Sequence, residues 1–127
     1  MEAGEYIKRI IESEGERVRY AKGETIFTCN TMPEYLFFII EGDILLIEAA
    51  IAGFHNGLNV SIDHILGLKE FITGSFYLTT ALSESDSSLL RIDKKAFETL
   101  FRDDIQFRMQ IVKNVSEGFI KKNKGYE

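Results

Sequence analysis

The chain has 127 residues, of which 45% are hydrophobic and 28% charged, and its formal net charge is −5. This size fits one domain, and this composition is typical of folded chains rather than disordered ones. The acidic balance argues against direct nucleic-acid binding, which relies on Lys and Arg. A single cysteine, Cys29, excludes an internal disulfide and favours a reducing cytoplasm. With no secretory signal or membrane-spanning run, we expect one cytoplasmic domain without membrane contact.

The first part of the chain changes from a helical pattern to a strand pattern. Four apolar residues at helical spacing predict a helix over residues 1–15: Tyr6, Ile7, Ile10 and Ile11. Val18 and Tyr20 then alternate with basic residues, which indicates a strand. Lys22–Gly23 predicts a turn before a second strand at Thr25–Thr28.

The middle of the chain predicts further strands separated by turns. Two apolar segments, Glu34–Ile40 and Ile44–Ile51, flank Glu41–Asp43, which we interpret as a tight hairpin. Asn56–Gly57 predicts a type I′ turn, because both residue types tolerate positive φ. This turn would join the second segment to a strand at Leu58–Ile62.

The last strands precede two predicted helices. Strands are expected at Phe76–Ala81 and Ser88–Ile92, and many short strands with frequent turns favour an antiparallel sandwich or barrel. Asp93 is a candidate cap for a helix over Lys94–Phe101. Asp103 or Asp104 then opens a longer helix.

The longer helix carries more apolar surface than one core contact needs. Its apolar residues cover a wider arc than a single core-facing stripe, which indicates a second partner. They are Ile105, Met109, Ile111, Val112, Val115, Phe119 and Ile120.

Four motifs follow one another in the chain, and their order is more specific than any one of them. They are Lys22–Phe27 (KGETIF), Tyr35–Gly42 (YLFFIIEG), Ile72–Gly74 (ITG) and Asp86–Phe97 (DSSLLRIDKKAF). Over about residues 18–101 the sequence resembles the cyclic-nucleotide-binding domain of Crp/Fnr-type bacterial transcription regulators. The final helix is similar to the dimer helix of those proteins.

The resemblance implies a mainly β fold, an antiparallel double-stranded β-helix or jelly roll with a short N-terminal helix and two C-terminal helices. The expected single domain, 1–127, has four parts: helix 1–15, β-roll 17–93, C-terminal helices 94–122 and tail 123–127. The expected homodimer would form through the last helix at Ile105, Met109, Val112, Val115 and Phe119.

The resemblance also identifies a phosphate-binding cassette that has lost its charged contacts. In the family, a Glu accepts a hydrogen bond from the ribose hydroxyl, and an Arg donates two parallel hydrogen bonds to the cyclic phosphate. Alignment on Thr73–Gly74 places Leu68 at the Glu position and Tyr77 at the Arg position. A buried phosphate without a cation is costly, so we expect no cofactor and no cyclic nucleotide bound in the usual way. The degenerate cassette comprises Gly67, Leu68, Lys69, Glu70, Tyr77, Leu78, Thr79 and Thr80.

The function implied is effector sensing and dimerisation for a Crp/Fnr-like regulator, with an unidentified small-molecule effector. Such a pocket would lie between Gly67 and Thr80 and be closed by residues 105–115, with Lys69 or Tyr77 as a replacement for the missing contacts. DNA would be read by a helix-turn-helix domain, for which these 127 residues leave no room. The alternative is a structural dimerisation module whose pocket is filled by Leu68, Tyr77 and neighbouring Phe side chains.

A metal enzyme is the least favoured alternative. Cupins are also small β-barrels, and His55 or His64 would have to bind their metal, but the chain has no third histidine. Haem ligation is known among relatives of the family, which makes His64 and Cys29 candidate axial ligands, although structural roles are commoner for such residues. No catalytic motif is visible, and we expect no enzyme.

Overall fold

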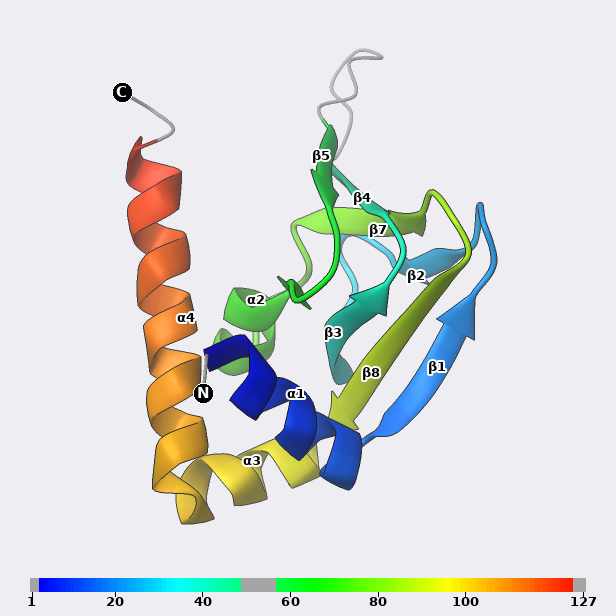
Figure 1. Ribbon diagram of the computed structural model, residues 1–127. Helices are drawn as coiled ribbons and strands as arrows, with labels where there is room; N and C mark the ends of the chain where they lie inside the picture. The colour runs from blue at the N-terminus through cyan, green and yellow to red at the C-terminus, as the bar shows by residue number, and fades with distance from the viewer. Residues whose placement is uncertain (1–2, 49–56, 125–127) are drawn as a thin grey trace.

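The computed structural model describes residues 3–48 and 57–124, with side chains described over 5–48 and 57–116. Its eight strands form two four-stranded antiparallel sheets, ordered β1-β8-β3-β6 and β2-β7-β4-β5 (Figure 1). The strands are β1 Glu16–Tyr20, β2 Thr25–Phe27, β3 Tyr35–Glu41, β4 Ile44–Glu48, β5 Gly57–Val60, β6 Ile65–Leu66, β7 Thr79–Ser83 and β8 Ser87–Asp93. The helices are α1 Ala3–Glu14, α2 Leu68–Thr73, α3 Lys94–Asp103 and α4 Ile105–Lys124.

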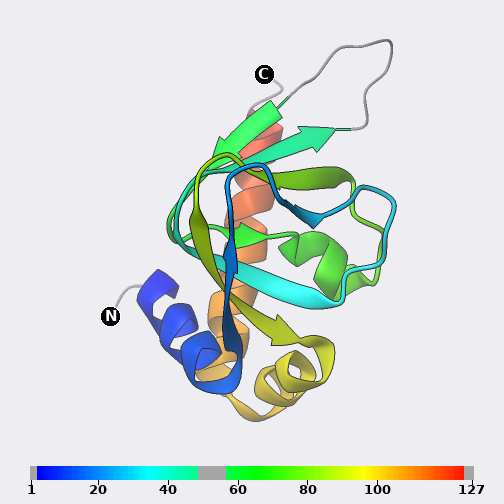
Figure 2. The ribbon, with the colours of Figure 1, turned by 90° about the vertical axis from the view of Figure 1, so that its right-hand side faces the viewer.

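The architecture confirms the predicted jelly roll with an N-terminal helix and two C-terminal helices. Helices α1 and α3 lie at one end of the roll, and α4 runs along its side (Figures 1 and 2). None of the helices within the described ranges is long and apolar enough to cross a membrane.

Strand alternation divides the core into two clusters, because successive side chains point to opposite faces of a sheet. On β8, Leu90 and Ile92 pack against the helices, in a cluster with Phe97, Phe107 and others. Leu89, on the opposite face, packs inside the roll with Phe27, Phe37, Ile39, Ile44, Leu66, Tyr77 and Ala81. The first sheet is therefore apolar on both faces, and it separates a helix-side core from a roll-interior core.

The hairpin predicted at Glu41–Asp43 is wrong. Strand β3 belongs to one sheet and β4 to the other, so this connection carries the chain between sheets. Gly42 has φ of 105°, a conformation that side chains other than glycine rarely adopt. A Cβ there would lie 2.1 Å from Oγ of Ser87, so the close approach to β8 also requires glycine.

The two-residue turn predicted at Asn56–Gly57 is also wrong. Gly57 is a strand residue of β5, paired with Ile47 of β4, so the chain does not reverse at this residue. Asn56, His55 and the end of the predicted strand 44–51 lie outside the described residues. The pairing of β4 with β5 itself agrees with the predicted partnership of these two segments.

The segment between β6 and β7 contains a helix that the sequence pattern did not predict. Helix α2 has only six residues, flanked by Gly67 and Gly74 at φ of 66° and 69°. Such a short segment cannot show a helical repeat. The strand predicted at Phe76–Ala81 begins later, at Thr79.

Aspartates begin both C-terminal helices. The Asp93 carboxylate accepts a hydrogen bond from the Ala96 amide at 2.8 Å, which confirms the predicted cap. Of the two candidates for α4, Asp104 accepts from the Phe107 amide at 2.9 Å. Asp104 also accepts from the Tyr6 hydroxyl at 2.9 Å, which ties α1 to the start of α4.

Candidate functional site

The cassette segment, residues 67–80, is built around Tyr77. Backbone hydrogen bonds hold Tyr77 on both sides: its amide donates to the Thr31 carbonyl, and its carbonyl accepts from the Asn30 amide, each at 2.9 Å. Its ring points into the roll and stacks on Phe27, with centroids 3.7 Å apart and planes 7° from parallel. The side chain is only 3% exposed. Tyr77 is therefore a core residue as well as the residue at the aligned Arg position.

The ring of Tyr77 occupies the space beside Gly67. A Cβ added to Gly67 would lie 2.6 Å from Cε1 of Tyr77, which is too close for any other residue type. The Tyr77 hydroxyl donates to the Tyr35 carbonyl at 3.4 Å. Burial raises the pKa of this phenol well above its ordinary value, and the charges of Glu70 and Glu34 raise it further. The group is thus a neutral phenol with no positive charge to offer a phosphate.

The other predicted cassette residues do not gather around Tyr77 in a polar pocket. Leu68 is half-buried and packs against the helix-side core rather than inside the roll. Lys69 and Leu78 are exposed, and Glu70 and Thr79 are half-buried. The Thr80 hydroxyl accepts from the Cys29 amide at 2.9 Å, a contact that links β7 to the turn after β2.

Helix α4 presents an exposed apolar stripe. Phe107 and Ile111 are fully buried against the helix-side core. Four residues on another face of the helix are 36 to 65% exposed: Ile105, Met109, Val112 and Val115. The side chain of Phe119 lies outside the described range. The principal contacts of α4 are with α1 and α3, and its Phe107 and Ile111 also share the helix-side core with Phe71 of α2.

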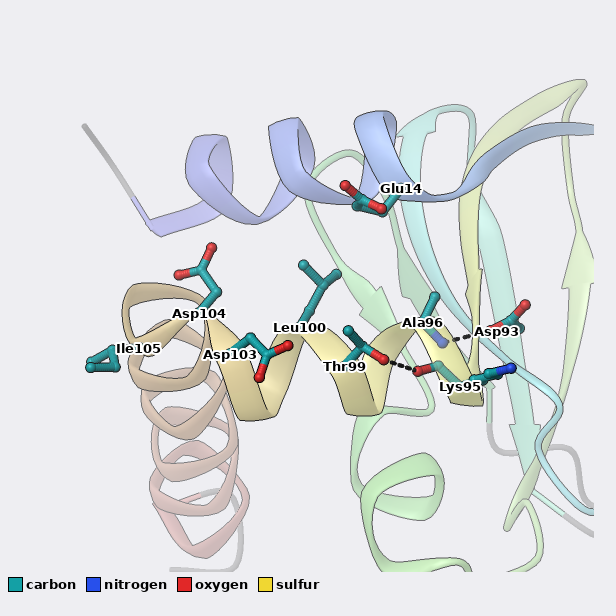
Figure 3. A pocket seen from close by; sticks show the side chains of 9 residues that line it. All are labelled: Glu14, Asp93, Lys95, Ala96, Thr99, Leu100, Asp103, Asp104 and Ile105. Atoms are coloured by element: carbon teal, nitrogen blue, oxygen red, sulfur yellow. Dashed lines mark hydrogen bonds between the residues drawn. The ribbon is translucent and has the colours of Figure 1, made fainter.

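A broad groove of about 650 Å³ lies between α1 and α3. Figure 3 shows Leu100 pointing from α3 towards α1 and Glu14 at the end of α1 across the groove. Three aspartates line it, but each is engaged within the protein: Asp93 and Asp104 cap helices, and Asp103 pairs with Arg102 at 2.8 Å. These carboxylates serve the local helix structure.

A cavity of about 360 Å³, called here the interior cavity, opens at the β1–β2 end of the roll beside Tyr77. Aromatic side chains form much of its wall, and Arg91 of β8 contributes a guanidinium. Arg91 was not among the residues predicted from sequence. Its direction could have been predicted from strand alternation, because Arg91 is two residues from Leu89 and its side chain lies on the same, inward face of the sheet.

The candidate metal and haem ligands have ordinary surroundings where they are described. Cys29 is half-buried, and its thiol donates to the Leu78 carbonyl at 3.5 Å. His64 is exposed and follows Asp63, a turn residue with φ of 70°. Within residues 3–48 and 57–124, no group of three His, Cys, Asp or Glu could hold a metal ion. His55 lies outside these residues.

Comparison with known proteins identifies relatives of the whole architecture. The sequence profile of the cyclic nucleotide-binding domain matches residues 17–104. No curated protein matches the sequence. The catabolite activator protein of Thermus thermophilus superimposes with a TM-score of 0.84 at 15% identity, covering 96% of this chain and 57% of that one. This chain thus spans little more than half of the Thermus protein.

Two further solved structures share the fold. A transcriptional regulator from Thermotoga maritima has a TM-score of 0.82 at 20% identity, with 94% of each chain covered. A c-di-GMP-responsive global regulator from Xanthomonas campestris has a TM-score of 0.77 at 12% identity, covering 94% of this chain and 61% of that one. At these identities the structural likeness speaks for the fold alone.

Proposed function

Because this chain belongs to the cyclic nucleotide-binding domain family, we propose that it is the effector-sensing and dimerisation domain of a Crp/Fnr-like transcription regulator that does not bind cyclic nucleotides in the family's usual way. The burial of Tyr77 at the aligned Arg position carries this proposal. DNA would be read by a separate helix-turn-helix domain, and the effector would be a different small molecule.

The charge balance of the cassette segment supports the nucleotide part of the proposal. A cyclic phosphate needs a cation or a set of charge-assisted donors when it leaves water. Tyr77 offers one hydroxyl, which already donates to a carbonyl, and its ring fills the space beside Gly67. Leu68 has no polar atom for a ribose hydroxyl. A bound nucleotide would have to displace a stacked core side chain, and the only cation within the cassette segment is Lys69, which is exposed.

The exposed stripe on α4 supports the dimer part of the proposal. Its members recur three or four residues apart, the spacing that aligns side chains along one face of a helix. Contiguous exposed apolar surface of this kind marks association sites in soluble proteins. A second copy of α4 packed along this stripe would bury Ile105, Met109 and Val112.

One observation favours a second candidate function, a dimerisation module without ligand. The Tyr77–Phe27 stack fills the part of the roll that faces the cassette segment, as a purely structural role would require. The interior cavity beside it favours the sensing role.

A thermal-unfolding scan with millimolar cyclic AMP or cyclic GMP tests the proposal. A ligand at 100 times its Kd adds about 2.7 kcal/mol to the stability of the folded state. We expect an unchanged midpoint with either nucleotide. A rise of several degrees would show that Lys69, Tyr77 or backbone groups replace the missing Glu and Arg, and would overturn the nucleotide part of the proposal.

A further inference from the structure

One wall of the interior cavity carries a positive charge, that of Arg91, which belongs to neither core cluster. On β8, Leu89 faces the roll interior, whereas Leu90 and Ile92 face the helices. Because strand side chains alternate, Arg91 faces the interior with Leu89. Its side chain is 26% exposed, so a partly accessible cation lies in a wall that also contains aromatic, aliphatic and hydroxyl-bearing side chains.

Internal contacts satisfy only part of the Arg91 guanidinium. Its Nε donates to the Glu16 carboxylate of β1, and its plane lies over the Tyr35 ring, 4.1 Å from the centroid. The hydrogen bond to Glu16 comes from Nε, and neither Nη group donates a hydrogen bond to another described residue. Two parallel N–H groups of this kind form the fork that binds a carboxylate with both oxygens.

The remaining wall favours a flat ring. Phe27 stacks on Tyr77, and Phe37 lies 6.3 Å from Phe27 and 6.1 Å from Tyr35 between ring centroids. Aromatic side chains pack well against other planar rings, face to face or edge to face. A volume of about 360 Å³ is at the lower end of the range of small-molecule pockets.

We infer that the interior cavity binds a planar aromatic carboxylate, with its carboxylate on the Nη groups of Arg91 and its ring between the aromatic side chains. This inference rests on the sensing role proposed above and names the chemical class of the effector. The site differs from the cassette segment, although the two share Tyr77: the face of that ring stacks on Phe27 in the cavity wall, and its edge lies against Gly67.

Two carboxylates near the cavity, Glu34 and Glu16, should affect the binding of an anion and of a cation in opposite directions. Glu34 also lines the cavity, but it is exposed, so solvent and salt screen its repulsion of an anionic ligand. Glu16 occupies Nε of Arg91 and competes for the same charge. Removal of either carboxylate should therefore strengthen the binding of an anion and weaken the binding of a cation.

The test is an NMR titration of the whole chain, observing the ring signals of Tyr20, Tyr35 and Tyr77. Three probes of one shape are compared: naphthoate, the uncharged naphthamide and the cationic naphthylmethylammonium. We expect saturable shifts with naphthoate at millimolar concentration or below, and much weaker binding of the other two. No saturable shift with naphthoate, or tighter binding of the ammonium probe, would overturn the inference.

Variants identify the anchor. Arg91→Gln should weaken naphthoate binding by at least about tenfold, because a charge-assisted bidentate contact is lost. Arg91→Lys keeps the charge without the fork and should also weaken it. Glu16→Gln is the matched control, since it breaks the same ion pair but retains Arg91, and it should bind naphthoate at least as tightly as the wild type. Unchanged affinity in a folded Arg91→Gln or Arg91→Lys protein would contradict the assignment.

The result of the naphthoate titration does not depend on the tests of dimerisation and of nucleotide binding. Failure of naphthoate to bind would leave the dimer and the nucleotide scan unaffected. Conversely, a monomeric chain, or one stabilised by cyclic AMP, could still bind naphthoate at Arg91.

Discussion

The cassette segment and helix α4 both carry large apolar or aromatic side chains, but Tyr77 of the first is buried whereas several residues of the second are exposed. In the cassette segment, Tyr77 turns inward, stacks on Phe27 and is almost fully buried. On α4, Val112 and its neighbours point outward and are a third or more exposed. The comparison shows that apolar character alone does not separate a filled site from an open one. The first region is closed by its own side chain, whereas the second lacks a covering partner within the described chain.

We expect the largest effect from removing the Tyr77 ring, which fills the space beside Gly67 in the cassette segment. Tyr77→Ala should lower the free energy of unfolding by about 3–5 kcal/mol, the usual cost of truncating a large buried aromatic residue. Denaturant unfolding measures this loss. Leu78→Ala is the control, because Leu78 is 60% exposed and a surface change typically alters stability by about 0.5 kcal/mol or less. Equal, small effects of the two variants would mean that Tyr77 is not a core residue.

The next prediction concerns the exposed apolar stripe of α4 as the dimer interface. Val112→Glu places a charge in the exposed stripe and should weaken self-association by at least about tenfold. Asn59→Glu adds the same charge at an exposed position of β5, outside α4, and it should leave association nearly unchanged. Sedimentation equilibrium distinguishes the two variants. A wild-type chain that is already monomeric at high concentration would contradict the proposed dimer.

Alkaline titration tests the burial of Tyr77 against the behaviour of an ordinary exposed tyrosine. Burial raises the pKa of Tyr77, so its phenol should remain protonated above about pH 10, where an ordinary tyrosine ionises. Its contribution to stability is present below the unfolded-state pKa and is lost as pH rises through the folded-state pKa. The pKa values of Tyr6 and Tyr20 are also raised, so the ultraviolet phenolate signal should contain a late component that becomes smaller, by the signal of one tyrosine, in Tyr77→Phe. A late component of unchanged size in that variant would assign it to the other tyrosines alone.

The smallest expected effect concerns Asp104, which fixes the start of α4. The Phe107 amide, followed by the Tyr6 hydroxyl, lowers the pKa of its carboxyl below the ordinary value. The corresponding stability is present above about pH 4, the ordinary pKa of Asp, and is lost as pH falls through the folded-state value. Thermal scans across this range should show a shallower acid dependence for Asp104→Asn, which keeps an acceptor for the cap, than for the wild type. Asp104→Ala should be less stable than Asp104→Asn at neutral pH.

The periodic parts of the chain were predictable from sequence, and the connections were not. Alternation and helical spacing predicted most of the regular elements, and Asp93 was recognised as a cap because its side chain acts locally. The hairpin at Glu41–Asp43 failed because local turn chemistry does not reveal whether the next strand joins the same sheet. Helix α2 was missed because six residues between two left-handed glycines show no repeat.

The candidate site was only partly predictable for a related reason. Alignment identified Tyr77 as the residue in place of an arginine, but its stacking on Phe27 depends on residues 50 positions apart in the chain. Arg91 looked like one polar residue in an alternating strand. Its inward direction becomes meaningful only when Glu16, Tyr35 and Phe27 are brought around it by both sheets.

The most direct test of the central claim, that Tyr77 closes the cassette segment to cyclic nucleotides, is an amide NMR titration with cyclic AMP that follows Gly67 and Gly74. We expect no saturable shift of either glycine at millimolar nucleotide, because the Tyr77 ring occupies the space beside Gly67 and the only cation of the cassette segment, Lys69, is exposed. A saturable shift of Gly67 together with the Tyr77 ring signals would contradict the account and show that this cassette still holds a cyclic nucleotide.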